Sequence, residues 1–170
     1  NIRGNWYWFD ADGYMETGWH LIDGTWYYFN SSGAMVTGWQ LIGNTWYYMD
    51  GSGAMATGWC LIGGTWYYFN GSGAMETGWH LIDGTWYYFN GSSGAMTTGW
   101  QLIGNTWYYL GTDGKMVTGL TTVTGAIYYL ESSGAMATGW RQIDGIWYYF
   151  NGSGAAHIGC PICAAPEPLK

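Results

Sequence analysis

The chain has 170 residues and a formal net charge of −7, and only four of its residues are Lys or Arg. This acidity excludes the basic footprint that binds nucleic acid, and it disfavours electrostatic docking on anionic lipid. No apolar run approaches the roughly 20 residues of a membrane span, so we expect no membrane insertion. The 14 Trp, 16 Tyr and 30 Gly residues predict that aromatic rings supply the packing and that glycines supply the turns.

A segment of about 20 residues recurs along the chain, which is the signature of a repeat architecture. Residues 1–9 correspond to the second half of one copy. Successive copies are 20 residues apart, except for 21 between Trp79 and Trp100, and the extra residue falls in the loop 90–94. Complete copies begin at Trp19, Trp39, Trp59, Trp79, Trp100, Leu120 and Trp140.

Each copy predicts a β-hairpin. In the copy that begins at Trp19, the segments WHLI and TWYYF flank Asp23-Gly24, which favours a two-residue turn because both turn residues need a positive φ. This turn sets the register, and paired residues share one face of the hairpin. The predicted pairs are Ile22 with Thr25, Leu21 with Trp26, His20 with Tyr27, and Trp19 with Tyr28. One face then carries Trp19, Trp26 and Tyr28, and the other carries His20, Ile22, Tyr27 and Phe29.

Isolated hairpins are marginal in water, so we expect the copies to bury one another's faces in an all-β solenoid of stacked hairpins. No segment shows the apolar spacing of a helix. The period breaks after Ala155. The prediction is therefore one solenoid domain over residues 1–156, with seven to eight hairpins of which the first is partial, and a C-terminal tail over residues 157–170.

The aromatic face has two interpretations at this point. It is either the solenoid core or a ligand cage, and the residues alone favour neither. Two Trp residues seven positions apart recur in nearly every copy, and a neighbouring copy can add a Tyr and a Met. Such a box suits a quaternary ammonium group, which is cationic and has no N–H group to satisfy.

The segments 18–37 and 78–98 share the pattern Gly-Trp-x4-Gly-x-Trp-Tyr-Tyr-Phe, followed by Gly-Ala-Met-x-Thr. This pattern closely resembles the choline-binding repeats of bacterial surface proteins, autolysins and phage lysins, and the resemblance covers Trp6 to about Ala155. It implies a left-handed β-solenoid that binds choline between consecutive repeats. It also implies that two Trp come from one repeat, and the second Tyr and the Met from the next.

Carried onto this sequence, the resemblance implies five complete choline sites. They are Trp19, Trp26, Tyr48 and Met55; Trp39, Trp46, Tyr68 and Met75; Trp59, Trp66, Tyr88 and Met96; Trp79, Trp86, Tyr109 and Met116; and Trp100, Trp107, Tyr129 and Met136. At a sixth position Leu120, Ile127 and Ala156 replace the Trp residues and the Met, leaving Tyr149, so we expect no choline there. Half-sites are expected at Trp140 with Trp147, and at Trp6 with Tyr28 and Met35.

The implied function is attachment to a bacterial cell wall. The ligand would be choline or phosphocholine on teichoic or lipoteichoic acid, and the protein would be secreted and held at the cell surface. Two alternatives stay open: a glucan- or other carbohydrate-binding module, and a structural spacer. Sugar sites add polar groups, and the polar candidates His20, His80, Gln40 and Gln101 lie on the face opposite the Trp pairs.

We predict no catalytic activity, no cofactor and no metal site. Asp23, Asp83 and Asp144 occupy turns, and no Ser/His/Asp or Cys/His grouping is evident. Cys60 stands where other copies carry His or Gln and is expected to be a free thiol. Cys160 and Cys163 lie in the tail near His157, where a disulfide or no role is favoured over a metal site. A homodimer through the solenoid ends is a further hypothesis.

Overall fold

The computed structural model describes residue 2 and residues 4–157. The chain divides into two compact units. The first comprises Asn1–His80 and Phe89–Met96, and the second comprises Leu81–Tyr88 and Thr97–Lys170. Of the predicted tail, only residue 157 is described; the remaining positions, which include Cys160 and Cys163, lie outside the described residues. No helix of the described residues is long and apolar enough to cross a membrane.

The described residues form antiparallel hairpins built from strands of five residues each. The strands are β1 Gly18–Ile22, β2 Thr25–Phe29, β3 Gly38–Ile42, β4 Thr45–Met49, β5 Gly58–Ile62, β6 Thr65–Phe69, β7 Gly78–Ile82, β8 Thr85–Phe89, β9 Gly99–Ile103, β10 Thr106–Leu110, β11 Gly119–Val123, β12 Ala126–Leu130, β13 Gly139–Ile143 and β14 Ile146–Phe150. Each odd-numbered strand pairs with the strand that follows it.

The hairpin turns and their register are as predicted. Asp23 and Gly24 have φ values of 49° and 80°, the left-handed conformation that a tight hairpin turn requires. Trp19 pairs with Tyr28, and Leu21 pairs with Trp26, so the two Trp residues share a face. The same register recurs in the hairpins β3–β4, β5–β6, β9–β10, β11–β12 and β13–β14.

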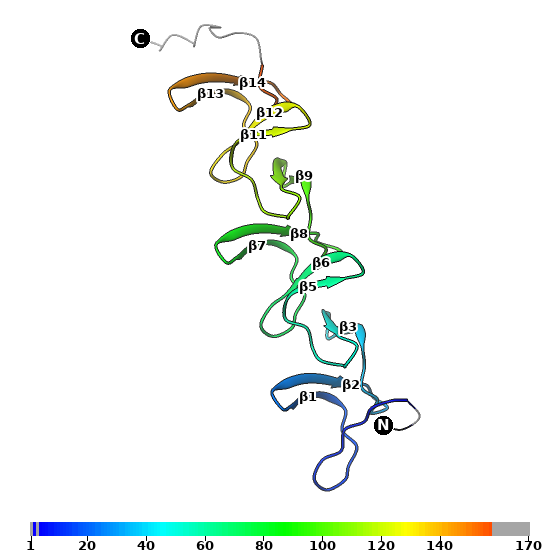
Figure 1. The fold of residues 1–170 in the computed structure, drawn as a ribbon. Coiled ribbons are helices and arrows are strands. Elements are labelled where there is room, and N and C mark those ends of the chain that lie inside the picture. The colour runs from blue at the N-terminus through cyan, green and yellow to red at the C-terminus, as the bar shows by residue number, and fades with distance from the viewer. Residues whose placement is uncertain (1, 3, 158–170) are drawn as a thin grey trace. The chain divides into compact units, whose positions relative to one another are not determined.

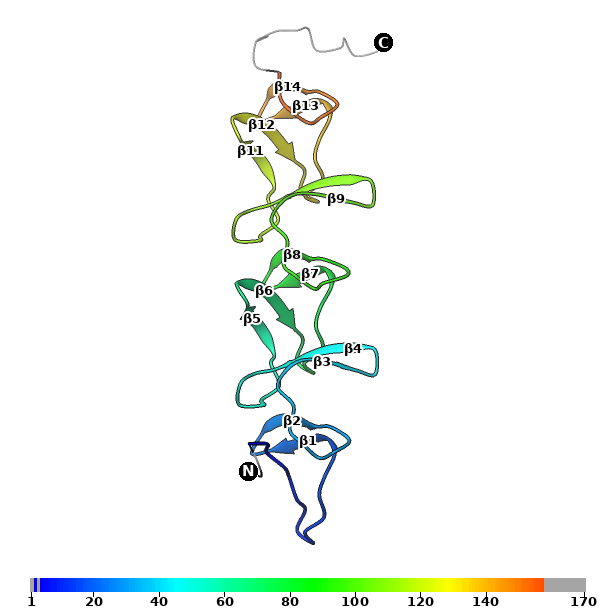
Figure 2. The same ribbon diagram turned by 90° about the vertical axis from the view of Figure 1, so that its right-hand side faces the viewer.

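Backbone hydrogen bonds join each repeat to the next. After β4, the chain turns back through an Asp50-capped loop, and the Met55 N–H donates to the carbonyl of Trp26 in the preceding hairpin at 2.9 Å. The same bond recurs in both units, for example from Met136 N–H to Trp107 O at 2.8 Å. Within the first unit, β1–β2, β3–β4 and β5–β6 point in different directions around their stack (Figures 1 and 2).

The most deeply buried large side chains belong to the last residue of each second strand, on the hairpin face opposite the Trp pair. These residues are 0–3% exposed: Phe29, Met49, Phe69, Phe89, Leu110, Leu130 and Phe150. In contrast, the second Trp of each Trp pair stays 40–47% exposed. The predicted all-β solenoid with about 20 residues per repeat is confirmed, and the Trp side chains lie largely outside its core.

Candidate ligand-binding sites

Each pocket starts from a perpendicular pair of Trp rings on one hairpin face. Trp39 lies on β3 and Trp46 lies on β4, in diagonal positions of the hairpin. Their ring centroids are 6.2 Å apart, and their planes meet at 86°. Diagonal neighbours on one face of a sheet are within reach of long aromatic side chains, which is why the hairpin register alone produces this arrangement. The pair therefore presents two walls at right angles.

The same Trp geometry recurs in both units. Within the first unit, Trp19–Trp26 and Trp59–Trp66 have centroid separations of 6.3 and 6.2 Å. Within the second, Trp100–Trp107 and Trp140–Trp147 are 6.4 and 6.5 Å apart. The interplanar angles are 80–87°.

A Tyr ring from the next repeat adds the third wall. The Tyr67 ring of β6 lies 4.8 Å from the Trp39 ring at 70°. Equivalent contacts join Trp19 to Tyr47 at 4.8 Å and Trp100 to Tyr128 at 4.7 Å. These Tyr residues are the first of the Tyr-Tyr pair in each repeat.

The second Tyr of each pair packs differently. Tyr48 contacts Trp39 of its own hairpin at 5.3 Å. Tyr68 lies 6.3 Å from the core residue Phe89, and Tyr129 is stacked on Phe150 at 6.2 Å and 25°. The second Tyr residues thus pack against their own Trp and against the core Phe of the following repeat.

A Met side chain completes the pocket. The backbone bond from Met75 to the Trp46 carbonyl, 2.9 Å long, holds the Met segment beside the Trp pair of the preceding repeat. A glycine makes room for this thioether: a Cβ atom at Gly94 would lie 2.3 Å from Met75 Sδ. The close contact with the Met75 side chain and the positive φ of 69° together require glycine at position 94.

These residues enclose a defined pocket in each unit. The Trp39 pocket has a volume of about 340 Å³ and is lined by Trp39, Trp46, Tyr67, Met75, Ser92 and Ser93. The Trp100 pocket, of about 310 Å³, is lined by Trp100, Trp107, Tyr128, Met136 and Ser153. No Lys, Arg, Asp or Glu lines either pocket. Three aromatic rings and a polarisable sulfur therefore form the apolar walls of each pocket, and this chemistry favours a bulky cation.

The structure brings together the predicted Trp and Met residues, but it places a different Tyr beside them. Tyr67 and Tyr128 line the pockets where the family resemblance implied Tyr68 and Tyr129. Within each unit, the face of a hairpin opposite its own Trp pair packs against the Trp pair of the preceding hairpin, as the contacts of Tyr67 with Trp39 and of Tyr128 with Trp100 show. The first Tyr lies on the face opposite its own Trp pair, because it pairs with the residue after the first Trp, and on that face Tyr67 contacts Trp39 of the preceding hairpin.

The remaining predicted sets are placed as follows. In the first set, the Trp19 ring contacts Tyr47 where Tyr48 was expected, and the Met55 N–H donates to the Trp26 carbonyl. The residues of the third and fourth sets are divided between the two units. In the third set Tyr88 belongs to the second unit, and in the fourth set Trp79 belongs to the first. Within single units, Met96 N–H donates to Trp66 O at 2.8 Å, and Met116 N–H donates to Trp86 O at 2.9 Å.

The sixth position keeps the backbone arrangement without the rings. Ala156 N–H donates to the Ile127 carbonyl at 2.7 Å, as Met does in the other repeats. Leu120 and Ile127 take the places of the two Trp residues on paired strands. The scaffold of the site thus survives where the aromatic walls are missing.

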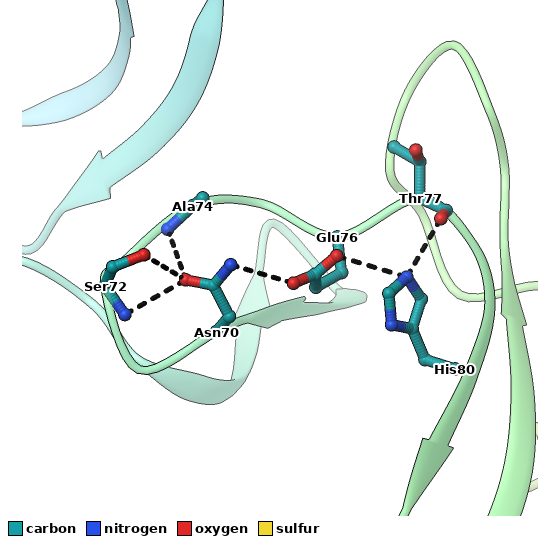
Figure 3. Close-up of polar contacts among 6 residues, drawn as sticks. All are labelled: Asn70, Ser72, Ala74, Glu76, Thr77 and His80. Carbon is teal, nitrogen blue, oxygen red and sulfur yellow. Dashed lines mark hydrogen bonds and ion pairs between the residues drawn. The ribbon is translucent and has the colours of Figure 1, made fainter.

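The residue after the first Trp has a structural partner in several repeats. His80 Nε2 lies 2.9 Å from the Thr77 carbonyl and 3.1 Å from a Glu76 carboxylate oxygen (Figure 3). Asn70 donates to the other Glu76 oxygen at 2.8 Å, and its own side-chain carbonyl accepts bonds from the loop (Figure 3).

Equivalent bonds to a Thr carbonyl come from His20, Gln40, Gln101 and Arg141, at 2.9–3.1 Å. Cys60 stands at the same place, and burial raises the pKa of its thiol. Among the described residues, no group of three or more His, Cys, Asp or Glu side chains could hold a metal ion. The polar residues of this face are therefore engaged in holding the strand to the segment before it.

Comparison with known proteins identifies the repeats. A family model described as "Choline-binding repeat" matches residues 16–58, 56–98 and 97–138, and a cell wall binding repeat model matches residues 1–15 and 138–156. No curated protein sequence matches the chain significantly.

Solved structures agree with the family models. CbpJ from Streptococcus pneumoniae TIGR4 matches with a TM-score of 0.85 and 42% identity, over 89% of this chain and 56% of that one. CbpF from S. pneumoniae, solved in the presence of a peptidoglycan analogue, matches at 0.83 and 44%, over 89% of this chain and 55% of that one.

The choline-binding domain of CbpL from S. pneumoniae matches with a TM-score of 0.65 and 32% identity, over 84% of this chain and 78% of that one. The chain thus spans just over half the length of the CbpJ and CbpF chains. The family models cover residues 16–138 with the choline-binding pattern. This chain belongs to the family of choline-binding repeats.

Proposed function

We propose that the repeats bind choline, or the choline end of phosphocholine, in the aromatic pockets between consecutive hairpins. The observation that carries this proposal is the Trp39 pocket, in which Trp39, Trp46 and Tyr67 present ring faces beside the Met75 thioether. A trimethylammonium group has no N–H donor, so the pocket needs no hydrogen-bond acceptor to hold it. The ring quadrupoles supply the attraction.

Single pockets should bind weakly. A cation on an aromatic face contributes about 0.5–2 kcal/mol, so three faces leave a few kcal/mol after the ligand is immobilised. A net of about −4 kcal/mol corresponds to a millimolar dissociation constant. Several pockets on one chain can instead engage one polymer, where effective concentration multiplies the weak affinities. The repetition of the pocket therefore favours a polymeric, choline-bearing ligand.

We propose accordingly that the repeats attach their parent protein to a bacterial cell wall that carries phosphocholine on teichoic or lipoteichoic acid. The support comes from the similarity to the pneumococcal CbpJ and CbpF proteins and from the match to a cell wall binding repeat model. Secretion to the cell surface follows from this role as part of the proposal. The repeats carry binding chemistry, and we assign them no catalytic step. A homodimer through the solenoid ends stays a prediction.

A carbohydrate ligand is less favoured than choline. A sugar stacked on Trp also needs side chains that bond its hydroxyl groups. The candidates Gln40 and Gln101 donate to backbone carbonyls at 2.9 Å, on the hairpin face opposite the Trp pair. His20 and His80 make the equivalent contact. The polar side chains that a glucan site would use are thus engaged elsewhere in the fold.

Sedimentation with purified cell walls tests the proposal. We expect the chain to co-sediment with walls that carry phosphocholine, to stay in solution with walls that lack it, and to be released by free choline. Trp46→Ala should weaken retention because it removes one wall of a pocket. Ile127→Ala is the matched control, since Ile127 occupies the same hairpin position in a repeat without rings. Equal retention on both kinds of wall would overturn the proposal.

A further inference from the structure

Loop serines from a third repeat reach both pockets. The Trp39 pocket is lined by Ser92 and Ser93, which follow β8, two hairpins beyond the Trp pair. The Trp100 pocket is lined at the corresponding place by Ser153, which follows β14. The loop that carries Ser92 is the one with an extra residue, so the two pockets differ by one serine.

The hydroxyl proton of Ser153 is engaged in a hydrogen bond within its own loop. Ser153 Oγ donates to the side-chain carbonyl of Asn151 at 2.7 Å, and this carbonyl also accepts from the Ser153 and Ala155 N–H groups. A serine has one hydroxyl proton, so Ser153 can offer a ligand only its lone pairs. It is therefore unsuited to an anionic partner.

In the longer loop, Ser93 is the serine whose hydroxyl donates to the Asn side chain at the start of the loop. Ser93 Oγ donates to the Asn90 side-chain carbonyl at 3.1 Å and lies 3.3 Å from the Ala95 N–H group. Ser92 supplies its backbone N–H to the same Asn90 oxygen at 3.0 Å. The Ser92 hydroxyl has no acceptor among the described residues, and the side chain is exposed at the pocket. The inserted residue thus brings a free hydroxyl donor to the Trp39 pocket.

We propose that Ser92 makes the Trp39 pocket prefer phosphocholine to choline. The trimethylammonium group enters the ring walls, and the Ser92 hydroxyl donates to a phosphate oxygen at the mouth of the pocket. An anionic oxygen is a stronger acceptor than the hydroxyl of free choline, and no Asp or Glu lines this pocket to repel it. This inference rests on the proposed function and adds a ligand preference to one of its pockets.

The expected selectivity is modest because the mouth of the pocket is open to water. One exposed hydrogen bond to a charged group should favour phosphocholine by about threefold to tenfold relative to the Trp100 pocket. The comparison between two pockets of the same chain cancels effects that act on both, such as the net charge of −7.

The test is ¹⁹F NMR of the chain labelled with 5-fluorotryptophan. The Trp46 and Trp107 signals report on the two pockets and are assigned with Trp46→Phe and Trp107→Phe. Choline and phosphocholine are titrated separately at constant ionic strength. We expect the ratio of choline Kd to phosphocholine Kd to be about threefold to tenfold higher at Trp46 than at Trp107.

Two variants separate the serine from the loop. Ser92→Ala should lower the ratio at Trp46 to the value at Trp107, and deletion of Ser92, which restores the usual loop length, should do the same. Ser31→Ala, at an exposed loop serine that lines neither pocket, is the matched control and should leave the ratios at Trp46 and Trp107 as they were. If both ligands bind at Trp46 with the ratio seen at Trp107, the Ser92 inference is wrong while the proposed function stands. If neither ligand moves the Trp46 signal, both are wrong.

Discussion

The two Tyr residues of one Tyr-Tyr pair should differ in role. Replacing the first should weaken choline binding, and replacing the second should lower the stability of the fold. Tyr128 lines the Trp100 pocket, with its ring 4.7 Å from that of Trp100. Its neighbour Tyr129 stacks on Phe150 at 6.2 Å and 25°. Leucine at either place keeps much of the apolar contact but removes the π face. Tyr128→Leu and Tyr129→Leu are therefore a matched pair of adjacent, chemically identical changes.

The expected magnitudes follow from what each ring contacts. One cation–π contact is worth about 0.5–2 kcal/mol, so Tyr128→Leu should raise the choline Kd of this pocket by about 2- to 30-fold. Tyr129→Leu should leave that Kd within about twofold, since a change below 0.5 kcal/mol has this size. It removes an aromatic pair worth about 0.5–1.5 kcal/mol and should lower the free energy of unfolding by a similar amount.

The Kd is read from the ¹⁹F signal of Trp107 in the 5-fluorotryptophan protein, and stability is read from guanidinium unfolding. The result that refutes the reasoning is the reverse pattern. If Tyr129→Leu weakens choline binding at Trp107 while Tyr128→Leu leaves it unchanged, the second Tyr holds the ligand, as the family resemblance implied.

Three further predictions concern stability. Thr124→Asn should raise the free energy of unfolding by up to about 1 kcal/mol in a denaturant titration, because Thr124 holds a φ of 48° that a β-branched residue adopts only with strain; an unchanged or lower value would contradict this. Cys60→Gln should raise thermal stability by about 0.5–1.5 kcal/mol, since Gln at this position donates to a Thr carbonyl in other repeats; a lower midpoint would count against it. The Ser52 hydroxyl bond lowers the pKa of the Asp50 carboxyl, so Asp50 stabilises the fold above its usual pKa, and this is lost as the pH falls through its folded pKa. Asp50→Asn keeps the acceptor and should shrink the acid-induced loss of stability measured by circular dichroism; an identical pH profile would refute this role.

Much of the fold could be predicted because its rules are local. The Asp23-Gly24 turn determines the hairpin register, and the register places Trp19 and Trp26 on one face without any knowledge of the rest of the chain. The repeat period then predicts stacking, because a single hairpin cannot bury its own faces. The Trp and Met positions of the pockets follow from these two rules and from the family resemblance.

The choice of Tyr could not be read from one hairpin. The register shows that Tyr67 and Tyr68 lie on opposite faces, but it does not show which face meets the preceding repeat. That depends on the bond from Met75 to the Trp46 carbonyl, which joins segments 29 residues apart and sets how the hairpins stack.

The loop serines were missed for a related reason. Ser92 lines the Trp39 pocket from two hairpins further along the chain, so its position depends on the accumulated geometry of successive repeats. The signal that could have found it is the insertion itself. All the other loops between the Trp19 and Trp140 copies have the same length. The one loop with an extra residue is the loop that carries Ser92 to the Trp39 pocket.

The most direct test of the ammonium cage is a tryptophan fluorescence titration with choline chloride, beside its neutral carbon isostere 3,3-dimethyl-1-butanol. Sodium chloride and dextran are titrated as controls for salt and for carbohydrate. A saturable response to choline in the millimolar range, with a much weaker response to the isostere, is what the aromatic walls predict. Equal responses to choline and its isostere, or a response to dextran alone, would contradict recognition of a cation by the Trp and Tyr rings.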